Sequence, residues 1–544
     1  MKKKFQSIYL LAFSAILFFV SGCGSNFLDI NRDPNYPIIV PLSQLLPYAQ
    51  LNMTNSLGLG PSGLSEPLSS FTHQIVVRDN WNSYFIVGDD FPIQQAWDNL
   101  YAGVFNDLRQ IINLGTTQEA WRYVGIAQIM QAYAASAMVD VWGNIPYTEA
   151  TQGLANPYPV FDSGEQIYPK LFTLLDAGIA NLAKTSAVSP SASDLFYGGN
   201  VVRWRKFAKT LKLKLYNQVR LTNLYNDAAV RALIAENDLM SGGADDFELR
   251  YGASLSPENR HPAFIQEYVQ GPEFFVSPYF YQIMKGTSTL NPILNGIPDP
   301  RSPYYFYNQL TPTQPAQNDV AYRDGGFVSI WFASLNIDPN EGFDQDQSQT
   351  VLGLYPIGGK YDNGQGGAVN VSGQLNQANS LQGAGFQRLF TYANSLYTRA
   401  ELALTKNSGE NAAALFEQAV RESFAEVNRM ATLASVPSLT EAVINEYVGR
   451  VVALYTAGNA DKKLELILTQ KWIAEFGFGL ESYNDIRRTG YPKPFDPNTD
   501  NNPFTVLNRN YVQSLPYSTT DLQINPKAPA QRNIATDKVF WDVD

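Results

Sequence analysis

Apolar side chains recur at helical spacing through much of this chain, and this pattern most restricts how the chain can fold. Large residues from Trp97 to Ile112 follow one another at intervals of three or four positions, which places them on one face of a helix. A second stripe, from 123 to 141, consists largely of small residues and would let a neighbouring helix approach closely. Further helical stripes follow at 163–182, 202–224, 389–404, 412–434, 440–455 and 462–476.

Capping boxes predict where three of these helices begin: Thr116 with Glu119, Ser163 with Gln166, and Ser438 with Glu441. Antiparallel helix pairs with small residues in their stripes are typical of a tetratricopeptide-like solenoid. A repeat of about 34 residues is not evident, so periodicity alone predicts helical pairs. We therefore expect a mostly α fold, with its helical scaffold mainly in residues 95–237 and 387–480.

The helical signal weakens between residues 238 and 386, where proline, glycine, asparagine and aromatic residues are frequent. A structureless loop of that length does not belong in a compact domain. We expect short strands, short helices and functional loops laid over the helical scaffold. The proline-rich end of the chain, from about residue 490, indicates an irregular segment that wraps the surface. Residues 42–544 are expected to form one large domain.

The N-terminal end has the features of an export signal. Lys2 to Lys4 precede an apolar run, from Ile8 to Val20, that is shorter than the roughly 20 residues of a membrane-spanning helix. Small residues and then Cys23 follow, which resembles a bacterial lipobox, in which the thiol takes a diacylglycerol and the amine a further acyl chain. The alternative is an ordinary secretory signal. We predict a signal peptide at 1–22 and a lipid-anchored tether at 23–41.

Cys23 is the only cysteine, so its acylation would leave no thiol for disulfides, metal binding or redox chemistry. Stability must then come from burial of apolar surface. The net charge of −11 argues against nucleic acid and anionic lipid headgroups as partners. The basic face of the 202–224 helix is accordingly expected to be solvated or paired with acids, in preference to an anion site.

Few residues suit catalysis. The chain has two histidines, His73 and His261, and neither lies in a recognisable nucleophile context. Motifs for zinc proteases, phosphate loops and dinucleotide binding are absent from the sequence. We expect both histidines to be structural and predict no catalytic residues and no cofactor. A glycosidase using two of the 50 acidic residues is the enzymatic alternative.

One acidic run supplies oxygen ligands of the kind that calcium prefers. Asp338, Asn340, Asp344 and Asp346 carry these oxygens, but their spacing is not that of an EF-hand loop. The run is therefore expected to be a solvated turn, with a structural calcium ion as the alternative.

Aromatic residues in loops are the better indication of function. A sugar ring offers a face of C–H groups, which an aromatic ring covers, and hydroxyls, which Asn, Asp, Arg and Gln satisfy. Two stretches mix both kinds of side chain, and they supply the predicted ligand-binding residues: Arg78, Trp81, Asn82 and Tyr84 in the first, and Tyr304, Tyr305 and Trp331 in the second. The alternative is that these aromatic residues pack loops onto helices.

Motifs along nearly the whole chain, taken in order, resemble those of the SusD/RagB family of Bacteroidetes outer-membrane lipoproteins. The most specific is Asp140-Val141-Trp142-Gly143-Asn144-Ile145-Pro146-Tyr147-Thr148-Glu149-Ala150. The other matching segments are residues 27–35, 197–199, 204–208, 211–213, 397–402, 470–474, 487–492 and 533–542.

This resemblance implies a fold of four tetratricopeptide-like helix pairs with a loop-rich ligand face, in which the matching motifs serve the scaffold. It also implies a partner, a SusC-like TonB-dependent transporter over which the lipoprotein forms a lid. The expected function is non-catalytic capture of oligosaccharides at the cell surface, or of peptides as the alternative. One departure concerns the export signal, because Gly24-Ser25-Asn26 follow Cys23 where surface lipoproteins of these bacteria usually carry acidic residues.

Overall fold

The computed structural model describes residues 40–78, 80–334, 344–371, 374–376, 378–496, 500 and 509–543. The predicted signal peptide, Cys23 and the predicted tether up to residue 39 lie outside this part of the chain. No helix within the described ranges is both long enough and apolar enough to cross a membrane.

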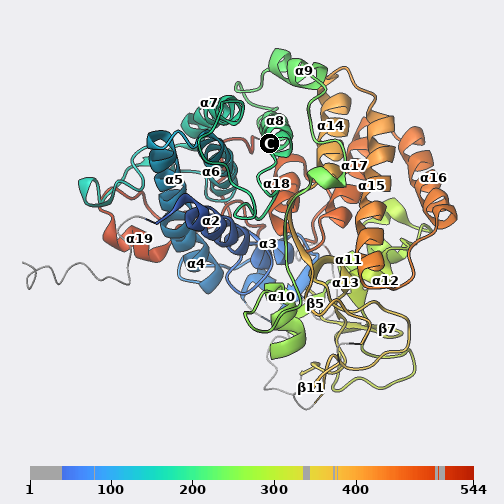
Figure 1. Ribbon diagram of the computed structural model, residues 1–544. Coiled ribbons are helices and arrows are strands. Elements are labelled where there is room, and N and C mark those ends of the chain that lie inside the picture. Colours follow the sequence, from blue (N-terminus) through green and yellow to red (C-terminus); the bar gives the residue numbers. More distant parts are fainter. Residues whose placement is uncertain are drawn as a thin grey trace, which may run out of the picture.

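Long helices form most of the described fold and gather in two groups (Figure 1). The first group comprises α2 (Leu42–Leu57), α4 (Phe91–Asn99), α5 (Asn106–Thr117), α6 (Trp121–Trp142), α7 (Gly164–Leu182), α8 (Val201–Gln218) and α9 (Asp227–Ala235). The second comprises α14 (Tyr392–Lys406), α15 (Ala412–Leu433), α16 (Glu441–Ala457), α17 (Ala460–Ala474) and α18 (Gly479–Thr489). Helix α8 of the first group and helix α18 of the second lie where the two groups meet, and the predicted mostly α fold is confirmed.

Short elements occupy the rest of the described chain, as predicted for residues 238–386. The short helices are α3 (Ser65–Phe71), α10 (Pro262–Phe264), α11 (Pro278–Lys285), α12 (Ser302–Tyr305), α13 (Leu354–Ile357) and α19 (Thr519–Ile524). The single-turn 3₁₀ and π segments are η2 (Asn80–Ser83), η3 (Leu100–Phe105), η4 (Gly153–Ala155), η5 (Gly243–Asp245), η6 (Ile265–Gln270) and η7 (Pro292–Leu294).

The strands pair only two by two in the described ranges, always antiparallel. The pairs are β1 (Ile75–Val77) with β5 (Phe274–Val276), β2 (Ile145–Pro146) with β3 (Phe161–Asp162), β4 (Phe247–Arg250) with β12 (Phe386–Phe390), β6 (Phe306–Tyr307) with β9 (Val351–Leu352), β7 (Tyr322–Asp324) with β8 (Phe327–Ser329), and β10 (Asn370–Val371) with β11 (Gln374–Leu375).

Helices α6 and α7 contact each other almost backbone to backbone, as the stripe of small residues predicted. A Cβ atom on Gly125 of α6 would lie 2.8 Å from the carbonyl oxygen of Gly178 on α7. It would also lie 3.0 Å from the amide nitrogen of Leu182. A side chain at position 125 would therefore push the two helices apart.

Of the three predicted capping boxes, one is confirmed and two are wrong. The Ser163 side chain accepts a hydrogen bond from the Gln166 amide and caps α7. Thr116 lies inside α5 and donates to the Ile112 carbonyl, so α6 begins after Ala120 without a side-chain cap. Helix α16 begins two residues later than the Ser438 box implies, because Thr440 is its N-cap.

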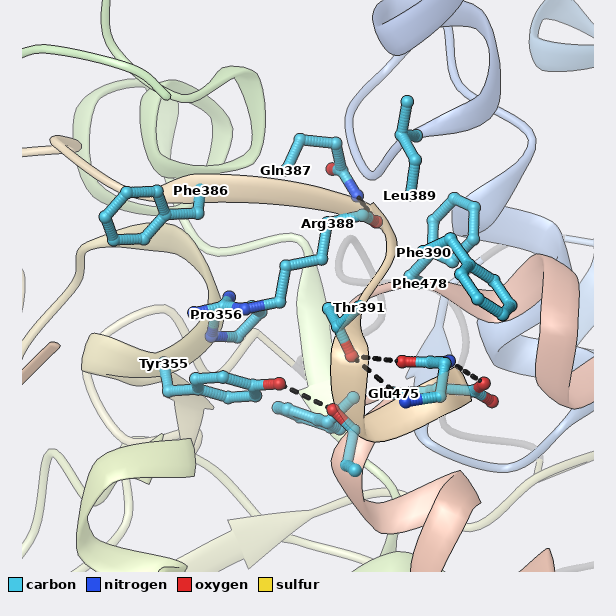
Figure 2. Close-up of a pocket in the computed structure, with 14 residues that line it drawn as sticks. Tyr355, Pro356, Phe386, Gln387, Arg388, Leu389, Phe390, Thr391, Glu475 and Phe478 are labelled. Carbon is cyan, nitrogen blue, oxygen red and sulfur yellow. Dashed lines mark hydrogen bonds between the residues drawn. The ribbon is translucent and has the colours of Figure 1, made fainter. Parts of the chain in front are cut away.

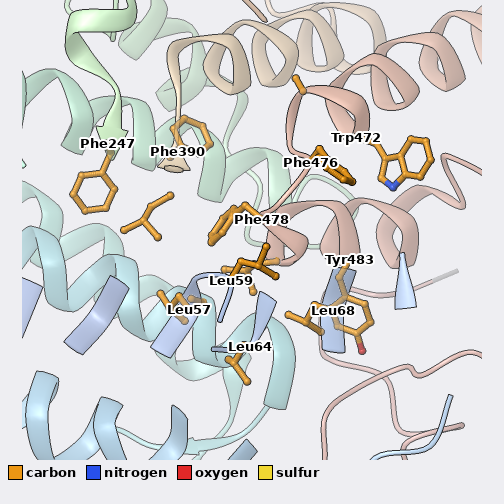
Figure 3. Close-up of a cluster of buried hydrophobic side chains, with 14 of the residues drawn as sticks. Leu57, Leu59, Leu64, Leu68, Phe247, Phe390, Trp472, Phe476, Phe478 and Tyr483 are labelled. Atoms are coloured by element: carbon orange, nitrogen blue, oxygen red, sulfur yellow. The ribbon is translucent and has the colours of Figure 1, made fainter. Parts of the chain in front are cut away.

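The hydrophobic core joins segments that are far apart in sequence (Figure 3). Leu57 of α2, and Leu64 and Leu68 at the start of and within α3, share one buried cluster with Phe476 and Phe478, which follow α17. Hydrogen bonds fix this junction, because the Trp472 indole nitrogen donates to the Thr72 carbonyl over 3.0 Å. The two helical groups are therefore held by one continuous core.

Acidic side chains pair with the basic face of α8, which confirms the preference for paired acids over an anion site. Lys206 lies 2.9 Å from Asp245, and Arg205 lies 2.7 Å from Asp238. Lys214 is buried and lies 2.9 Å from Glu481 of α18. The charges on α8 thus bind it to its neighbours.

The motif that begins at Asp140 has the scaffold role that the resemblance implied. Asp140 is fully buried, and its Oδ1 accepts hydrogen bonds from the Tyr168 hydroxyl and from the Trp541 indole nitrogen, over 2.5 and 2.9 Å. Its Oδ2 lies 3.4 Å from the Lys214 ammonium. Two positions on, the Trp142 indole donates to the Pro516 carbonyl over 2.9 Å. The motif therefore ties α6 to α7, to α8 and to the C-terminal segment.

Both histidines are buried, in agreement with a structural role. Burial lowers the pKa of His73 and of His261 to about 3, so both rings are neutral at physiological pH. The Nε2 atom of His73 lies 2.6 Å from the Tyr84 hydroxyl, and Nδ1 of His261 accepts from the Ala263 amide.

Candidate ligand-binding site

The fold brings together two stretches that the sequence separates widely. The Ala333 amide donates to the Asn82 carbonyl over 2.8 Å, and the rings of Tyr84 and Phe332 lie 4.5 Å apart. Segment η2, which carries Trp81 and Asn82, therefore lies against the loop that follows β8 and carries Trp331. The fold thus places Trp81, Asn82 and Tyr84 of the first predicted stretch next to the loop that carries Trp331, the last residue of the second.

Trp81 and Asn82 contribute buried polar groups at this junction. Their side chains are 6 % and 1 % exposed. The indole nitrogen of Trp81 and both polar atoms of the Asn82 amide have no hydrogen-bond partner among the described residues. An unsatisfied buried polar group costs about 1–3 kcal/mol. A polar ligand that reached these atoms would find both donors and an acceptor.

Arg78, three positions before Trp81, is half-buried. Its guanidinium carbon lies 4.8 Å from the centre of the Phe275 ring. Burial lowers the pKa of Arg78, while the carboxylates of Asp346, Asp344 and Glu273 oppose that change. Arg78 therefore brings a positive charge, close to acids, to the short link between β1 and η2.

Asp344 and Asp346 form a hydrogen-bonded pair of carboxyl groups near Arg78. Burial, and then the bond and charge of Asp344, raise the pKa of Asp346 to about 6. Burial alone would raise the pKa of Asp344 too, but hydrogen bonds from Asp346 hold it below its usual value. Asp338 and Asn340, the other members of the predicted run, lie outside the described residues. Within the described ranges no cluster of three or more His, Cys, Asp or Glu residues could hold a metal.

Trp331 is the predicted aromatic residue that keeps open surface. It is half-buried and packs edge-on against Tyr322, with ring centres 5.1 Å apart. Tyr322 begins β7 and is also half-buried. The side-chain amide of Gln282 donates to its hydroxyl over 3.3 Å. Tyr322 was not among the predicted residues, although its position at the start of a hairpin beside Arg323 and Asp324 was a usable signal.

The structure gives no support for a ligand role of Tyr84, Tyr304 or Tyr305, because all three are buried. The Tyr84 hydroxyl donates to the Phe495 carbonyl, and the Tyr304 hydroxyl to the Pro437 carbonyl. Tyr305 is 0 % exposed and stacks on Tyr355, with ring centres 4.7 Å apart. For these residues the stated alternative fits, since they pack loops onto the scaffold.

A cavity of about 20 Å³, the size of one water molecule, lies between β12 and the segment after α17 (Figure 2). The Arg388 guanidinium carbon lies 4.2 Å from the centre of the Tyr355 ring there. Glu475 and Thr391 face the same space, and burial raises the pKa of Glu475 to about 8. This cavity is too small for a nutrient molecule.

A larger, open cavity of about 450 Å³ lies between α4, the loop around η4, and α19. Trp97, Tyr101 and Pro146 form its aromatic and apolar lining, and Asp98 and Asp521 add carboxyl groups. No sequence pattern indicates this cavity, because its walls come from three separate stretches of the chain.

Comparison with known proteins places the fold in a family. Residues 34–511 match the SusD-like family, whose description is starch-binding and associating with the outer membrane. Because the match spans most of the chain, the protein belongs to the SusD-like family. The family predicted from the sequence motifs is thus confirmed.

Solved structures share this fold at low sequence identity. A chitin-binding SusD homologue from Flavobacterium johnsoniae is 19 % identical, with a TM-score of 0.66 over 92 % of this chain and 99 % of that one. A SusD/RagB family protein from Bacteroides thetaiotaomicron is also 19 % identical, with a TM-score of 0.66 over 93 % and 99 % of the two chains. No curated protein sequence matches this chain.

Proposed function

We propose that this protein captures oligosaccharides at the outer membrane without cleaving them and passes them to a SusC-like TonB-dependent transporter. The observation that carries the proposal is the match of residues 34–511 to a family described as starch-binding and associating with the outer membrane. The chitin-binding SusD homologue of the same fold adds support for a saccharide ligand.

The predicted lipid anchor fits this role. Acylation of Cys23 would hold the protein at the membrane, since each buried methylene contributes about 0.8 kcal/mol and several chains add up. The proline-containing segment up to residue 41 then acts as the tether between the anchor and α2. A protein held in this way can stay at a transporter and still swing away from it.

Sugar capture is assigned to the surface around Trp331, Tyr322 and Arg78, with Asn82 and Trp81 behind it. Trp331 and Tyr322 supply partly open rings for the C–H face of a sugar. Arg78 and the unpartnered amide of Asn82 supply hydrogen bonds for hydroxyls. Apolar rings with a few polar groups are the usual composition of such sites.

The carboxyl pair at this surface does not have the arrangement of a glycosidase. Catalytic carboxyl groups stand about 5–5.5 Å apart in retaining enzymes and about 6.5–9.5 Å apart in inverting ones, to embrace the scissile bond. Asp344 and Asp346 instead belong to one turn, in which the Asp346 amide donates to Oδ1 of Asp344 over 3.0 Å and each carboxyl group shifts the pKa of the other. This supports capture without cleavage.

A glycan array followed by calorimetry tests the ligand class. Trp331→Ala is expected to weaken binding of the captured oligosaccharide at least about tenfold, or about 1.4 kcal/mol. Tyr48→Ala, which removes a 58 % exposed ring on α2, is the matched control and should bind like the wild type.

Three results would count against parts of the proposal. Equal binding by Trp331→Ala and the wild type would remove the assigned site. Saturable binding to a peptide library, with none to any glycan, would replace the ligand class by peptides. Release of shortened products from a bound glycan would make the protein an enzyme. Co-purification with a TonB-dependent transporter from detergent extracts of outer membranes tests the partner.

A further inference from the structure

The 450 Å³ cavity beside α19 is separate from the surface around Trp331. Its lining comes from α4 and η3, from the stretch between β2 and β3, and from α19. Helix α19 lies with α4 at one side of the molecule, while β7 lies at the other (Figure 1). A volume of this size is within the range of about 300–1,000 Å³ that is typical of small-molecule sites.

The apolar part of the lining is rigid on one side and exposed on the other. Trp97 is almost fully buried, and the centre of its ring lies 5.1 Å from the ring centres of both Tyr101 and Trp142. The Tyr101 hydroxyl is fixed by a 2.8 Å bond to the Pro146 carbonyl. Ile524 of α19, by contrast, lines the cavity and is 63 % exposed.

The charged part of the lining is entirely acidic. Asp98 and Asp521 line the cavity, whereas no lysine or arginine does so among the described residues. The Oδ2 atom of Asp521 is buried and accepts no hydrogen bond from any described residue. Burial, and then the negative charge of Asp98, raise the pKa of Asp521.

From this arrangement we propose that the cavity is a second binding site, which takes a compact organic ammonium ion. The ammonium group would lie by the Asp521 and Asp98 carboxylates and donate to the buried Oδ2 atom of Asp521. The carbon body would pack on Tyr101 and Ile524, whose surfaces are open to the cavity. A cation there relieves the repulsion between the two carboxylates, and an aromatic wall adds a favourable cation–π contact.

A neutral sugar does not match this cavity as well. A neutral ligand would leave two like charges unneutralised, and an anion would add a third. Amino sugars and lysine side chains both carry the required ammonium group on a carbon body of suitable size. The site does not depend on the proposed capture of oligosaccharides by the surface around Trp331.

Binding by the purified full chain at about pH 7 tests the proposal, with calorimetry or ligand-observed NMR as the readout. Glucosamine and Nα-acetyl-lysine amide are the two ammonium probes, and N-acetylglucosamine is the uncharged match of the first. We expect at least one ammonium probe to bind at least tenfold more tightly than N-acetylglucosamine. The probe that binds identifies an amino sugar or a lysine side chain as the source.

Two variants locate the site. Asp521→Asn should weaken binding of the ammonium probe at least tenfold, because the amide keeps the shape but loses the charge. Thr520→Trp, at an exposed position of α19, should block binding by filling the cavity. Asp461→Asn, an exposed acid at the start of α17, makes the same change in net charge and should have no effect.

The proposal would be overturned if neither ammonium probe bound, or if neither bound more tightly than N-acetylglucosamine. Unchanged binding by a folded Asp521→Asn variant, checked by its thermal unfolding curve, would overturn it too. Trp331→Ala distinguishes the two proposals, because it should weaken oligosaccharide binding and leave binding of the ammonium probe unchanged.

Discussion

Replacement of Asp140 by alanine should cause one of the largest losses of stability in this protein. Asp140 is the only acceptor that the structure shows for the Tyr168 hydroxyl and for the Trp541 indole nitrogen in the described ranges. Alanine would leave both donors buried and unpaired. It would also remove one of the two carboxylates near Lys214, which would retain Glu481 at 2.9 Å.

The magnitude follows from these contacts. Each buried donor left without an acceptor costs about 1–3 kcal/mol. Loss of a whole buried ion pair costs about 3–5 kcal/mol, but Lys214 keeps its second partner, so only part of that applies. We therefore expect Asp140→Ala to lower the free energy of unfolding by about 3–6 kcal/mol. Trp541→Phe, which removes one donor, should cost about 1 kcal/mol.

Urea unfolding, followed by tryptophan fluorescence, measures the effect as a shift in the urea concentration at which half of the protein is unfolded. Asp176→Ala is the matched control, because Asp176 is 62 % exposed and pairs with Lys212 at the surface. A surface pair of that kind contributes about 0–1 kcal/mol. If Asp140→Ala shifted the midpoint no more than Asp176→Ala, the role of Asp140 as a buried acceptor that joins four segments would be refuted.

Three further substitutions test the packing and the ionisation of buried groups. Gly125→Val should destabilise the protein by about 1–3 kcal/mol, because its side chain meets the Gly178 carbonyl; Gly449→Val, where a Cβ meets nothing, is the control for thermal unfolding. The pKa of Asp346 is raised, so its contribution to stability is present at low pH and is lost as the pH rises through about 6. Asp346→Asn should therefore raise the unfolding temperature at pH 8 relative to wild type and change it little at pH 4. The pKa of Glu401 is lowered from 4.5 to about 2, because two arginines outweigh its burial, so its contribution is lost as the pH falls through that range. Glu401→Gln should destabilise the protein at pH 7 and flatten the acid limb of its stability curve, and an unchanged acid limb would contradict this.

Local patterns were sufficient to predict most long helices, because an amphipathic stripe reports directly on which face a helix buries. Helix α15, predicted at 412–434, runs from Ala412 to Leu433. Helix α2 was not predicted as a helix, since its apolar segment is short and contains Pro47. The capping box at Thr116 failed because α5 continues through it, with the hydroxyl bonded back to the preceding turn. The local sequence does not show whether Thr116 ends the preceding helix, α5, or begins the next one, α6.

The ligand site was predicted less well, because aromatic content does not say which rings are covered. Trp331 and Tyr305 are both aromatic residues in the same loop-rich segment. Trp331 keeps open surface beside Tyr322, whereas Tyr305 is enclosed by Tyr355 and Phe476 from other parts of the chain. Only the packing of distant segments separates a ring that can meet a ligand from one that supports the core.

The sequence by itself determined the helical scaffold, the family and the single thiol at Cys23, because each of these depends on spacing or composition along the chain. The tertiary structure decided how charges and cavities are arranged. The basic face of α8 is neutralised by acids up to 267 positions away, as in the pair of Lys214 with Glu481. The acidic cavity beside Tyr101 exists because α19 returns from the far end of the chain to cover α4. Coulomb interactions and exclusion of water act through space, so sequence spacing does not reveal them.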